Sequence, residues 1–277
     1  MKIIHFKKQP LKNRVINHRQ GSFKYVELGE GNPNEINNYN LRWVLSEPDF
    51  FSPRHHHNFD QVRIQMKGSF KFDADGEMSP DDVGFFPEGT FYGPQTSDAN
   101  TIQLVMQIGG ASQNGYLSEA NRIEATNELS RNGQFIKGKY YPNDKTGESG
   151  KDAFQAIWEF FYKKKMQYPP QRFSRPILMN LKAMNWTSDP QRSGIEHKIA
   201  WDFGPQTVGL RKLRMQPESS ILFSGPISGF LTSGECVLND KRTVTQHDVF
   251  HLEKGELLNC HSIDVSEWLI FIHPDFS

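Results

Sequence analysis

Short segments that alternate apolar and polar residues, separated by turn residues, most strongly limit what this chain can fold into. They fill residues 41–110 and return after residue 175, with a stretch of different texture between. Alternation with a period of two is typical of β-strands that bury one face. Many short strands of this kind predict a sandwich or barrel rather than a parallel α/β sheet.

The middle of the chain predicts two helices instead. Ser118 can cap the first helix, which we expect to end near Asn132 and Gly133. The second helix should stop before Pro169. One of its faces is apolar and aromatic, and this face is either a lid over a ligand or the packing face of a connector. That face is formed by Phe154, Ile157, Trp158 and Phe161.

The order of a β-rich unit, a helical segment and a second β-rich unit indicates a duplicated architecture. We predict an N-terminal barrel with an extended N-terminal arm over residues 1–112. A helical linker follows over 113–175, and a C-terminal barrel occupies 176–277. The predicted fold class is therefore all-β, with two barrels and a short helical connector.

Charge and hydropathy exclude several function classes. The chain has 32 Lys and Arg against 32 Asp and Glu, so no global field attracts nucleic acid or an anionic membrane. No apolar run approaches the roughly 18 residues of a membrane span, and charges interrupt the N-terminus before a signal peptide can form. Cys236 and Cys260 lack a CxxC spacing, which favours reduced cysteines. We expect a cytoplasmic protein that binds neither nucleic acid nor membrane.

The most informative segment is residues 53–68, PRHHHNFDQVRIQMKG. On an extended strand alternate residues share a face, so His55 and His57 point the same way, and Gln61 joins them if the register continues. Two imidazoles with a nearby oxygen donor can bind one divalent metal ion. The alternative for His55 and His57 is a hydrogen-bonded pair inside a polar barrel.

The same alternation places Arg63 and Gln65 on the inward face of the strand. A buried guanidinium is costly without an anionic partner. Asp60, Asp82 or another internal carboxylate could supply that partner. The alternative is that Arg63 binds a carboxylate or enolate of a substrate.

A later strand adds further candidate pocket residues. Gln103 and Gln107 share one of its faces, and Phe91, Phe85 or Phe86 could supply apolar walls. Together with an inward arginine, these residues predict a pocket for a small organic acid, aromatic or carbonyl-bearing.

About twenty residues after the histidines comes a second informative segment, residues 81–92. Pro87 and Gly89 fit a tight turn that returns a side chain over the barrel mouth.

Through these two segments, residues 53–68 and 81–92, the chain resembles the cupin superfamily. The two motifs of that superfamily are usually written G-x5-H-x-H-x3,4-E-x6-G and G-x5-P-x-G-x2-H-x3-N. The second motif matches at Pro87-x-Gly89. The first motif matches with its gaps intact at His55, His57, Gln61 and Gly68. The resemblance implies two jelly-roll barrels, also called double-stranded β-helices.

The departures from the motifs bear on the metal. Gln61 stands in place of the usual carboxylate, Tyr92 in place of the third histidine, and Asp81 in place of the opening glycine. A neutral amide is a weaker ligand than a carboxylate, and a phenol with a pKa of about 10 must lose its proton to bind strongly. The resemblance implies a weakened or altered site in which His55, His57 and Gln61 hold Fe, Ni, Mn or Zn.

The C-terminal barrel resembles a cupin without the metal ligands. Ser219 and Ile221 occupy the region of the HxH motif, while Glu253 and Leu258 replace the proline and histidine of the second motif. Hydrogen-bonded strand residues are the ordinary explanation for the remaining histidines of this barrel. Among them are His247, His251 and His261.

Two functions remain open at this point. The first is a metal-dependent dioxygenase or isomerase for a small organic acid or carbonyl compound, with Tyr92 as proton donor or polar anchor and Arg63 as carboxylate clamp. The second is a non-catalytic ligand-binding or sensory protein with an eroded metal site. Cupins commonly dimerise, so the resemblance implies a homodimer, or two barrels that mimic one. For either function, we predict that Gln65, Phe91 and Gln103 belong to the ligand pocket.

Overall fold

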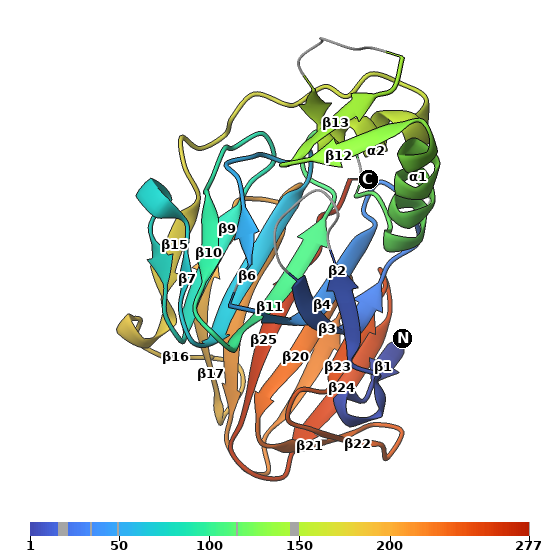
Figure 1. The fold of residues 1–277 in the computed structure, drawn as a ribbon. Helices are drawn as coiled ribbons and strands as arrows, with labels where there is room; N and C mark the ends of the chain where they lie inside the picture. The colour runs from blue at the N-terminus through green and yellow to red at the C-terminus, as the bar shows by residue number, and fades with distance from the viewer. Residues whose placement is uncertain (16–21, 34, 49, 115, 145–149, 277) are drawn as a thin grey trace. The chain divides into compact units, whose positions relative to one another are not determined.

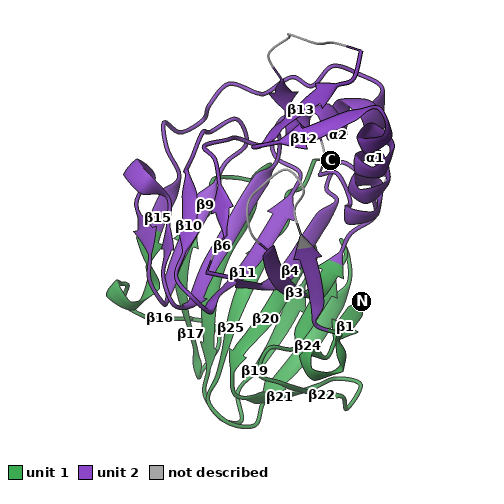
Figure 2. Cartoon of the chain, in the orientation of Figure 1, with its two compact units in different colours: residues 1–10, 26–29, 179–277 green, residues 11–25, 30–178 purple. Residues whose placement is uncertain are grey.

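The chain forms two compact units, each built mainly of antiparallel strands (Figure 2). The computed structural model describes residues 1–15, 22–33, 35–48, 50–114, 116–144 and 150–276. The N-terminal unit comprises Leu11–Tyr25 and Glu30–Leu178. The C-terminal unit comprises Met1–Pro10, Val26–Gly29 and Met179–Ser277. The predicted all-β class with a helical connector is confirmed.

The N-terminal unit contains a seven-stranded sheet of order β15-β9-β6-β11-β4-β3-β2 and a four-stranded sheet of order β5-β10-β7-β8 (Figure 1). The strands of the larger sheet are β2 Lys12–Val15, β3 Ser22–Glu30, β4 Tyr39–Ser46, β6 Asp60–Lys67, β9 Asp82–Phe86, β11 Thr101–Ile108 and β15 Ile177–Asn180. The smaller sheet consists of β5 Phe51–Ser52, β7 Phe70–Lys71, β8 Glu77–Met78 and β10 Gln95–Ser97, with a 3-10 turn at Asp73–Asp75.

Both predicted helices are present in the N-terminal unit. Helix α1 spans Glu119–Arg131, and the side chain of Ser118 caps it by accepting a hydrogen bond from Asn121 N. Helix α2 spans Ala153–Tyr162, and Asp152 caps it by accepting from Gln155 N. A three-stranded sheet that the sequence did not indicate lies between the helices in the chain. Its strands are β12 Gly133–Ile136, β13 Lys139–Pro142 and β14 Lys151–Asp152.

The C-terminal unit also has two sheets, of orders β1-β23-β20-β25-β18-β17-β16 and β19-β24-β21-β22. The larger sheet consists of β1 Lys2–Ile4, β16 Thr187–Ser188, β17 Ile195–Trp201, β18 Gly209–Met215, β20 Ile227–Ser233, β23 Val249–Leu252 and β25 Ser266–Ile272. The smaller consists of β19 Ser220–Ser224, β21 Glu235–Leu238, β22 Thr243–Thr245 and β24 Leu257–Ser262. Short 3-10 turns occur at Phe6–Lys8 and Leu181–Ala183.

The first strand of the chain belongs to the C-terminal unit. Strand β1 pairs with β23, with Lys2 opposite His251 and Ile4 opposite Val249. Pairing buries Ile4, which a free arm would leave in water. The N-terminal arm was predicted as part of the first barrel, and its first ten residues lie elsewhere. The predicted boundaries near residues 112 and 175 stay predictions.

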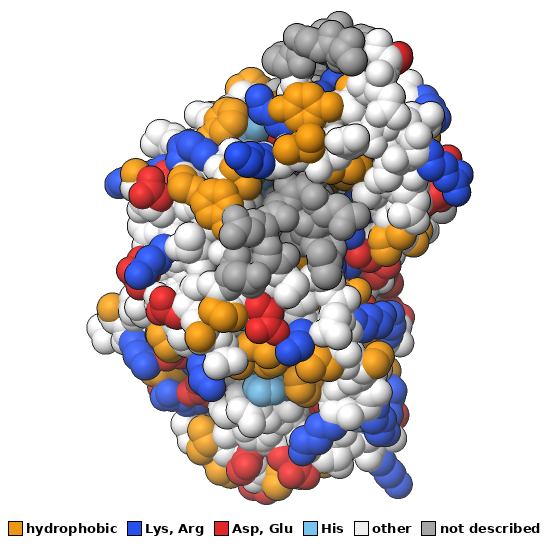
Figure 3. All heavy atoms as spheres, viewed as in Figure 1, with side chains coloured by type: hydrophobic (Ala, Val, Ile, Leu, Met, Phe, Trp, Pro, Cys, Tyr) orange, Lys and Arg blue, Asp and Glu red, His pale blue; other side chains and the backbone are white. Residues whose placement is uncertain are grey.

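Charged side chains of both signs are interspersed on the face of the protein shown in Figure 3. This distribution matches the equal numbers of acidic and basic residues in the chain. Neither helix among the described residues is long and apolar enough to cross a membrane. The cytoplasmic location and the homodimer stay predictions.

A buried chain of hydrogen bonds runs through the C-terminal unit. Ser228 Oγ lies 2.7 Å from both His251 Nδ1 and His273 Nε2, and His251 Nε2 lies 2.7 Å from Leu28 O. A carbonyl only accepts, so His251 Nε2 donates to Leu28, Nδ1 accepts from the Ser228 hydroxyl, and that oxygen accepts from His273. Neutral imidazoles satisfy this chain. Burial lowers the pKa of His251 to about 4 and that of His273 to about 3.

We predict that the free energy of unfolding falls as the pH is lowered from about 6.5 towards 4. The unfolded chain binds protons on these histidines near pH 6.5, whereas the folded chain binds them only at lower pH. Stability is therefore lost on acidification, by up to about 1.4 kcal/mol per pH unit for each histidine. Urea unfolding at several pH values measures the slope. His251→Gln should flatten this slope; identical slopes in wild type and His251→Gln would contradict this account.

Candidate functional site

The two cupin-like motifs meet through the backbone of His55. This residue forms an isolated antiparallel bridge with Tyr92, with N···O distances of 3.1 and 3.0 Å. The condition that an extended strand continues in register from the two histidines to Gln61 is not met, because β6 begins only at Asp60. The chain turns before that point, and the His57 carbonyl accepts a hydrogen bond from Gly89 N in the second motif at 2.7 Å.

The side chains of His55 and His57 nevertheless lie together and are buried. Their ring centroids are 4.8 Å apart, and the Tyr92 ring lies 4.7 Å from His55 and 5.9 Å from His57. His55 Nδ1 donates to Pro53 O at 2.6 Å. That bond turns Nε2 towards the side chain of Gln95, whose Nε2 lies 3.4 Å away. The expected convergence of the two imidazoles is therefore present without the expected strand.

His56 and Phe91 lie apart from this cluster. The His56 ring is stacked between Phe91, at 3.9 Å, and Tyr168, at 3.6 Å. Its Nδ1 lies 3.2 Å from Gly89 O. Phe91 is 42% exposed and is not among the residues that line the cavity described below. The structure places Phe91 against His56 instead of in a pocket wall.

Polar side chains form rows on one face of the larger sheet in the N-terminal unit. Strand β11 lies between β4 and β6, and directly paired residues on neighbouring strands share a face. The three rows are Asn40, Gln107 and Gln61; Arg42, Val105 and Arg63; and Val44, Gln103 and Gln65. The predicted inward positions of residues 61, 63, 65, 103 and 107 therefore share one face.

A cavity of about 130 Å³ opens on this face of the sheet. Four arginines line it, Arg14, Arg42, Arg63 and Arg122, and no described lining residue is Asp or Glu. His57, Gln61 and Gln103 also line it, whereas His55, Gln65 and Tyr92 do not. Its aromatic walls are Phe23, Phe50, Phe59, Phe70, Tyr116 and Phe154.

Arg63 is held by an amide oxygen and by aromatic ring faces. Its Nε donates to Gln61 Oε1 at 2.7 Å. The guanidinium carbon lies 5.1 to 5.9 Å from four ring centroids, within the range of cation–π attraction. These rings belong to Phe70, Phe72, Phe86 and Tyr92. Tyr92 also donates its hydroxyl to Gln61 Oε1 at 3.4 Å.

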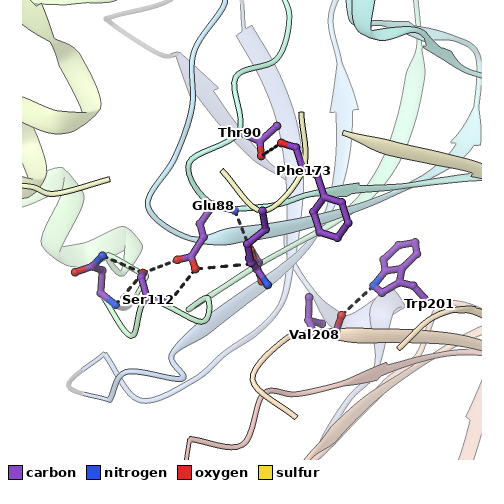
Figure 4. Close-up of polar contacts among 9 residues, drawn as sticks. Glu88, Thr90, Ser112, Phe173, Trp201 and Val208 are labelled. Atoms are coloured by element: carbon purple, nitrogen blue, oxygen red, sulfur yellow. Dashed lines mark hydrogen bonds and ion pairs between the residues drawn. The ribbon is translucent and has the colours of Figure 1, made fainter. Parts of the chain in front are cut away.

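Asp60, predicted as one partner of Arg63, binds Arg172 instead. Its Oδ1 accepts from Arg172 Nη2 at 2.6 Å and from Glu88 N at 2.9 Å. The Glu88 carboxylate accepts from Ser112 N at 2.8 Å and from the Ser112 hydroxyl at 2.5 Å (Figure 4). Burial raises the pKa of Asp60 to about 6, against the opposing charge of Arg172. This network fixes the segment after α2 to the barrel.

The other three arginines of the cavity meet at Glu119, the first residue of α1. The Glu119 carboxylate lies 3.0 Å from Arg14, 3.1 Å from Arg42 and 2.6 Å from Arg122. Burial raises the pKa of Glu119, but the three guanidiniums outweigh it and bring the value down to about 2. Burial and the charge of Arg122 lower the pKa of Arg14 to about 9. Positive charge is therefore concentrated at this end of the cavity.

Sequence reasoning missed this cluster. Strand alternation over Asn40 and Val44 could have indicated Arg42, because a charged residue stands between two inward positions. Arg14 lies in the short strand β2 and Arg122 in helix α1 of the connector. No sequence motif marks either position.

Helix α2 covers part of the cavity. The Phe154 ring lies edge-on to His57 at 5.4 Å and to Phe59 at 5.6 Å. Ile157 and Trp158 pack in the hydrophobic core of the connector. Phe154 therefore lines the cavity, whereas Ile157 and Trp158 belong to the packing face of the connector; the role of a lid over a ligand stays a prediction.

The predicted donor set does not fit a tightly held divalent metal. His55 and His57 are suitable nitrogen donors. Gln61 Oε1, however, already accepts a hydrogen bond from the positively charged Arg63, which opposes a dication at the same oxygen. Tyr92 is a phenol that donates to that oxygen. No group of three or more His, Cys, Asp or Glu in the described part of the chain could hold a metal.

His247, His251 and His261 of the C-terminal unit have separate neighbours. His247 stacks on Phe230 at 5.5 Å, and His261 Nδ1 lies 3.0 Å from Ser220 Oγ. His251 belongs to the buried hydrogen-bond chain already described. These contacts agree with the ordinary explanation of hydrogen-bonded or packed strand residues. Loss of the cupin ligands from this barrel stays a prediction.

No protein-family model and no curated protein matches this chain. Solved structures do. A candidate dioxygenase from Nostoc punctiforme is 12% identical with a TM-score of 0.64, covering 100% of this chain and 83% of that one.

Oxalate decarboxylase from Bacillus subtilis is 14% identical with a TM-score of 0.56, covering 99% of this chain and 76% of that one. A further structure of that decarboxylase is described by its Mn(II) centres. Likeness at this level of identity concerns the fold. The chain shares the fold of these solved structures.

Proposed function

We propose that the N-terminal barrel binds a small organic acid in the arginine-lined cavity, without a resident metal ion. One observation carries the proposal: four guanidinium groups line the cavity, and none of its described lining residues is a carboxylate. Buried guanidiniums are stable only with anionic or strongly polar partners. Three of the four pair with Glu119, and a bound carboxylate would form additional charge-assisted hydrogen bonds.

Gln61 orients Arg63 without cancelling its charge. A glutamate at this position would form a buried ion pair with Arg63, whereas the amide oxygen accepts from Nε at 2.7 Å and stays neutral. The terminal nitrogens of a guanidinium bind a carboxylate side by side in a fork. Arg63 is therefore the carboxylate clamp of the proposal, with Gln61 and the ring of Tyr92 as the groups that position it.

The cavity limits the size and character of the acid. Its volume of about 130 Å³ is close to that of an engineered cavity of roughly 150 Å³ that holds benzene. The aromatic walls, including Phe59 and Phe154, favour an apolar body. An acid with one ring or a short hydrocarbon chain meets both requirements.

Arg63→Gln should weaken binding of benzoate or hexanoate roughly ten- to hundredfold, because a charged hydrogen bond is lost in a buried site. Isothermal titration calorimetry on the purified chain measures the affinity. Arg54→Gln is the matched control, since Arg54 is 46% exposed and pairs with Asp75 outside the cavity. Equal affinity of wild type for benzoate and for neutral benzamide would contradict the proposal, as would unchanged binding in Arg63→Gln.

A metal-dependent oxygenase or isomerase is the second candidate. The adjacency of His55 and His57 favours it, because Nδ1 of His55 is bonded to a backbone carbonyl in the manner typical of metal-ligating histidines. In that case Arg63 and Tyr92 keep the predicted roles of clamp and proton donor. The donor chemistry of Gln61 opposes this candidate.

Gln61→Glu separates the two candidates. In the acid-binding protein the new carboxylate pairs with Arg63 and competes with the ligand, so we expect at least about tenfold weaker acid binding. In a metal enzyme the same change supplies the missing carboxylate ligand and raises metal content. Elemental analysis after supplementation with iron, nickel, manganese or zinc measures this. Near-stoichiometric metal in wild type that disappears in both His55→Ala and His57→Ala would overturn the acid-binding proposal.

A further inference from the structure

The cavity adjoins a second, smaller pocket at Phe154. The smaller pocket has a volume of about 20 Å³, which is room for about one water-sized group. Residues 52, 53, 55 and 56 line it from the barrel, and residues 138, 152 and 153 line it from the connector. Among the described residues that line the two spaces, Phe154 alone lines both.

The two histidines of the first motif are divided between these spaces. His57 lines the cavity, whereas His55 lines the smaller pocket, although their ring centroids are only 4.8 Å apart. The Phe154 ring lies edge-on to His57, with centroids 5.4 Å apart. Phe154 therefore belongs to the thin wall that separates the cavity from the pocket beside His55.

The backbone that carries Phe154 is fixed by hydrogen bonds on both sides. Asp152 caps α2 by accepting from Gln155 N at 2.9 Å. Ala153 N donates to Gly138 O at 2.9 Å, and the Ala153 side chain is buried. The fold therefore sets where the ring begins, and the ring can leave the wall only by changing its own rotamer.

Aromatic neighbours hold the Phe154 ring on the cavity side. Its centroid lies 5.6 Å from that of Phe59, at an interplanar angle of 76°, and Phe59 meets Tyr116 edge-on at 5.2 Å. Edge-to-face contacts of this kind are favourable arrangements of aromatic rings. A packed wall of rings resists added atoms, because a larger guest must displace a side chain from these contacts.

We propose that Phe154 determines the size of the apolar body that the cavity admits. Its ring closes the cavity against the smaller pocket, so a body with one ring fits and a body with two fused rings does not. A smaller side chain at this position joins the two spaces and gives a second ring room beside His55. The proposal rests on the acid-binding function for the charged end of the ligand, but the wall acts on the body alone.

Calorimetry on the full chain tests this with one-ring and two-ring ligands that carry the same polar group. The acids are benzoate and 2-naphthoate, and the neutral pair is benzamide and 2-naphthamide. In wild type we expect the one-ring member of each pair to bind at least about tenfold more tightly, because the second ring must displace Phe154.

Phe154→Ala should raise the ratio of two-ring to one-ring affinity at least about tenfold in both pairs. Phe154→Leu keeps an apolar side chain in the connector and should shift the ratio in the same direction, which covers the case in which the alanine variant does not fold. Phe154→Trp should weaken benzoate binding at least about tenfold, because its larger ring takes up part of the cavity.

Phe161→Ala is the matched control. Phe161 lies on the same helix, is partly buried against the same connector core as Phe154, and lines neither space. Loss of its ring costs packing in the connector without opening the wall. The affinity ratio in this variant should stay within about threefold of wild type.

The outcomes separate this proposal from acid binding. If wild type binds benzoate and 2-naphthoate equally well, or if Phe154→Ala and Phe154→Leu leave the ratio unchanged, Phe154 does not set the size of the body, while acid binding stands. If the amides bind as tightly as the acids and show the expected shift, acid binding fails and the role of Phe154 stands. If none of the four ligands binds, both proposals fail.

Discussion

The N-terminal barrel depends on how buried arginine side chains are accommodated. A guanidinium taken out of water must find strong hydrogen-bond acceptors or an opposite charge, since it cannot lose its proton. Arg172 finds Asp60, and the cluster at the start of α1 finds Glu119. Arg63 is held by a neutral amide and ring faces. The Glu119 cluster and Arg63 place guanidinium groups at the cavity, whereas the Arg172–Asp60 pair fixes the connector to the barrel.

The central strands of the same sheet separate two different environments. On β11 the positions of Leu104 and Met106 are fully buried, while Gln103 and Gln107 alternate with them on the cavity face. The apolar face supplies the burial that stabilises the sheet. That stability allows the opposite face to remain polar, which is costly for folding and useful for recognition. The site is therefore supported by packing that does not touch it.

Local pattern was enough to predict much of this architecture. Alternation and turn residues predicted the all-β class, and Ser118 marked the first helix correctly because capping is a local interaction. Motif spacing predicted that His55 and Tyr92 lie close together, and they do because a backbone bridge joins their segments. Phe91 was predicted as an apolar pocket wall and instead stacks on His56, since side-chain bulk alone does not tell a pocket wall from a stacking partner. Arg122 was missed because its role arises from tertiary contacts between the connector and the sheet.

The departures from the cupin motif act together in this barrel. Glutamine at position 61 accepts from Arg63 through a neutral amide oxygen, and tyrosine at position 92 donates to the same oxygen. A histidine there would compete for a metal, whereas a phenol supports the amide and offers its ring to the guanidinium. A single substitution would leave a half-satisfied polar group, but the pair forms a consistent network. A positive charge bonded to Gln61 Oε1 opposes a dication at that oxygen, which is the basis for proposing an acid there.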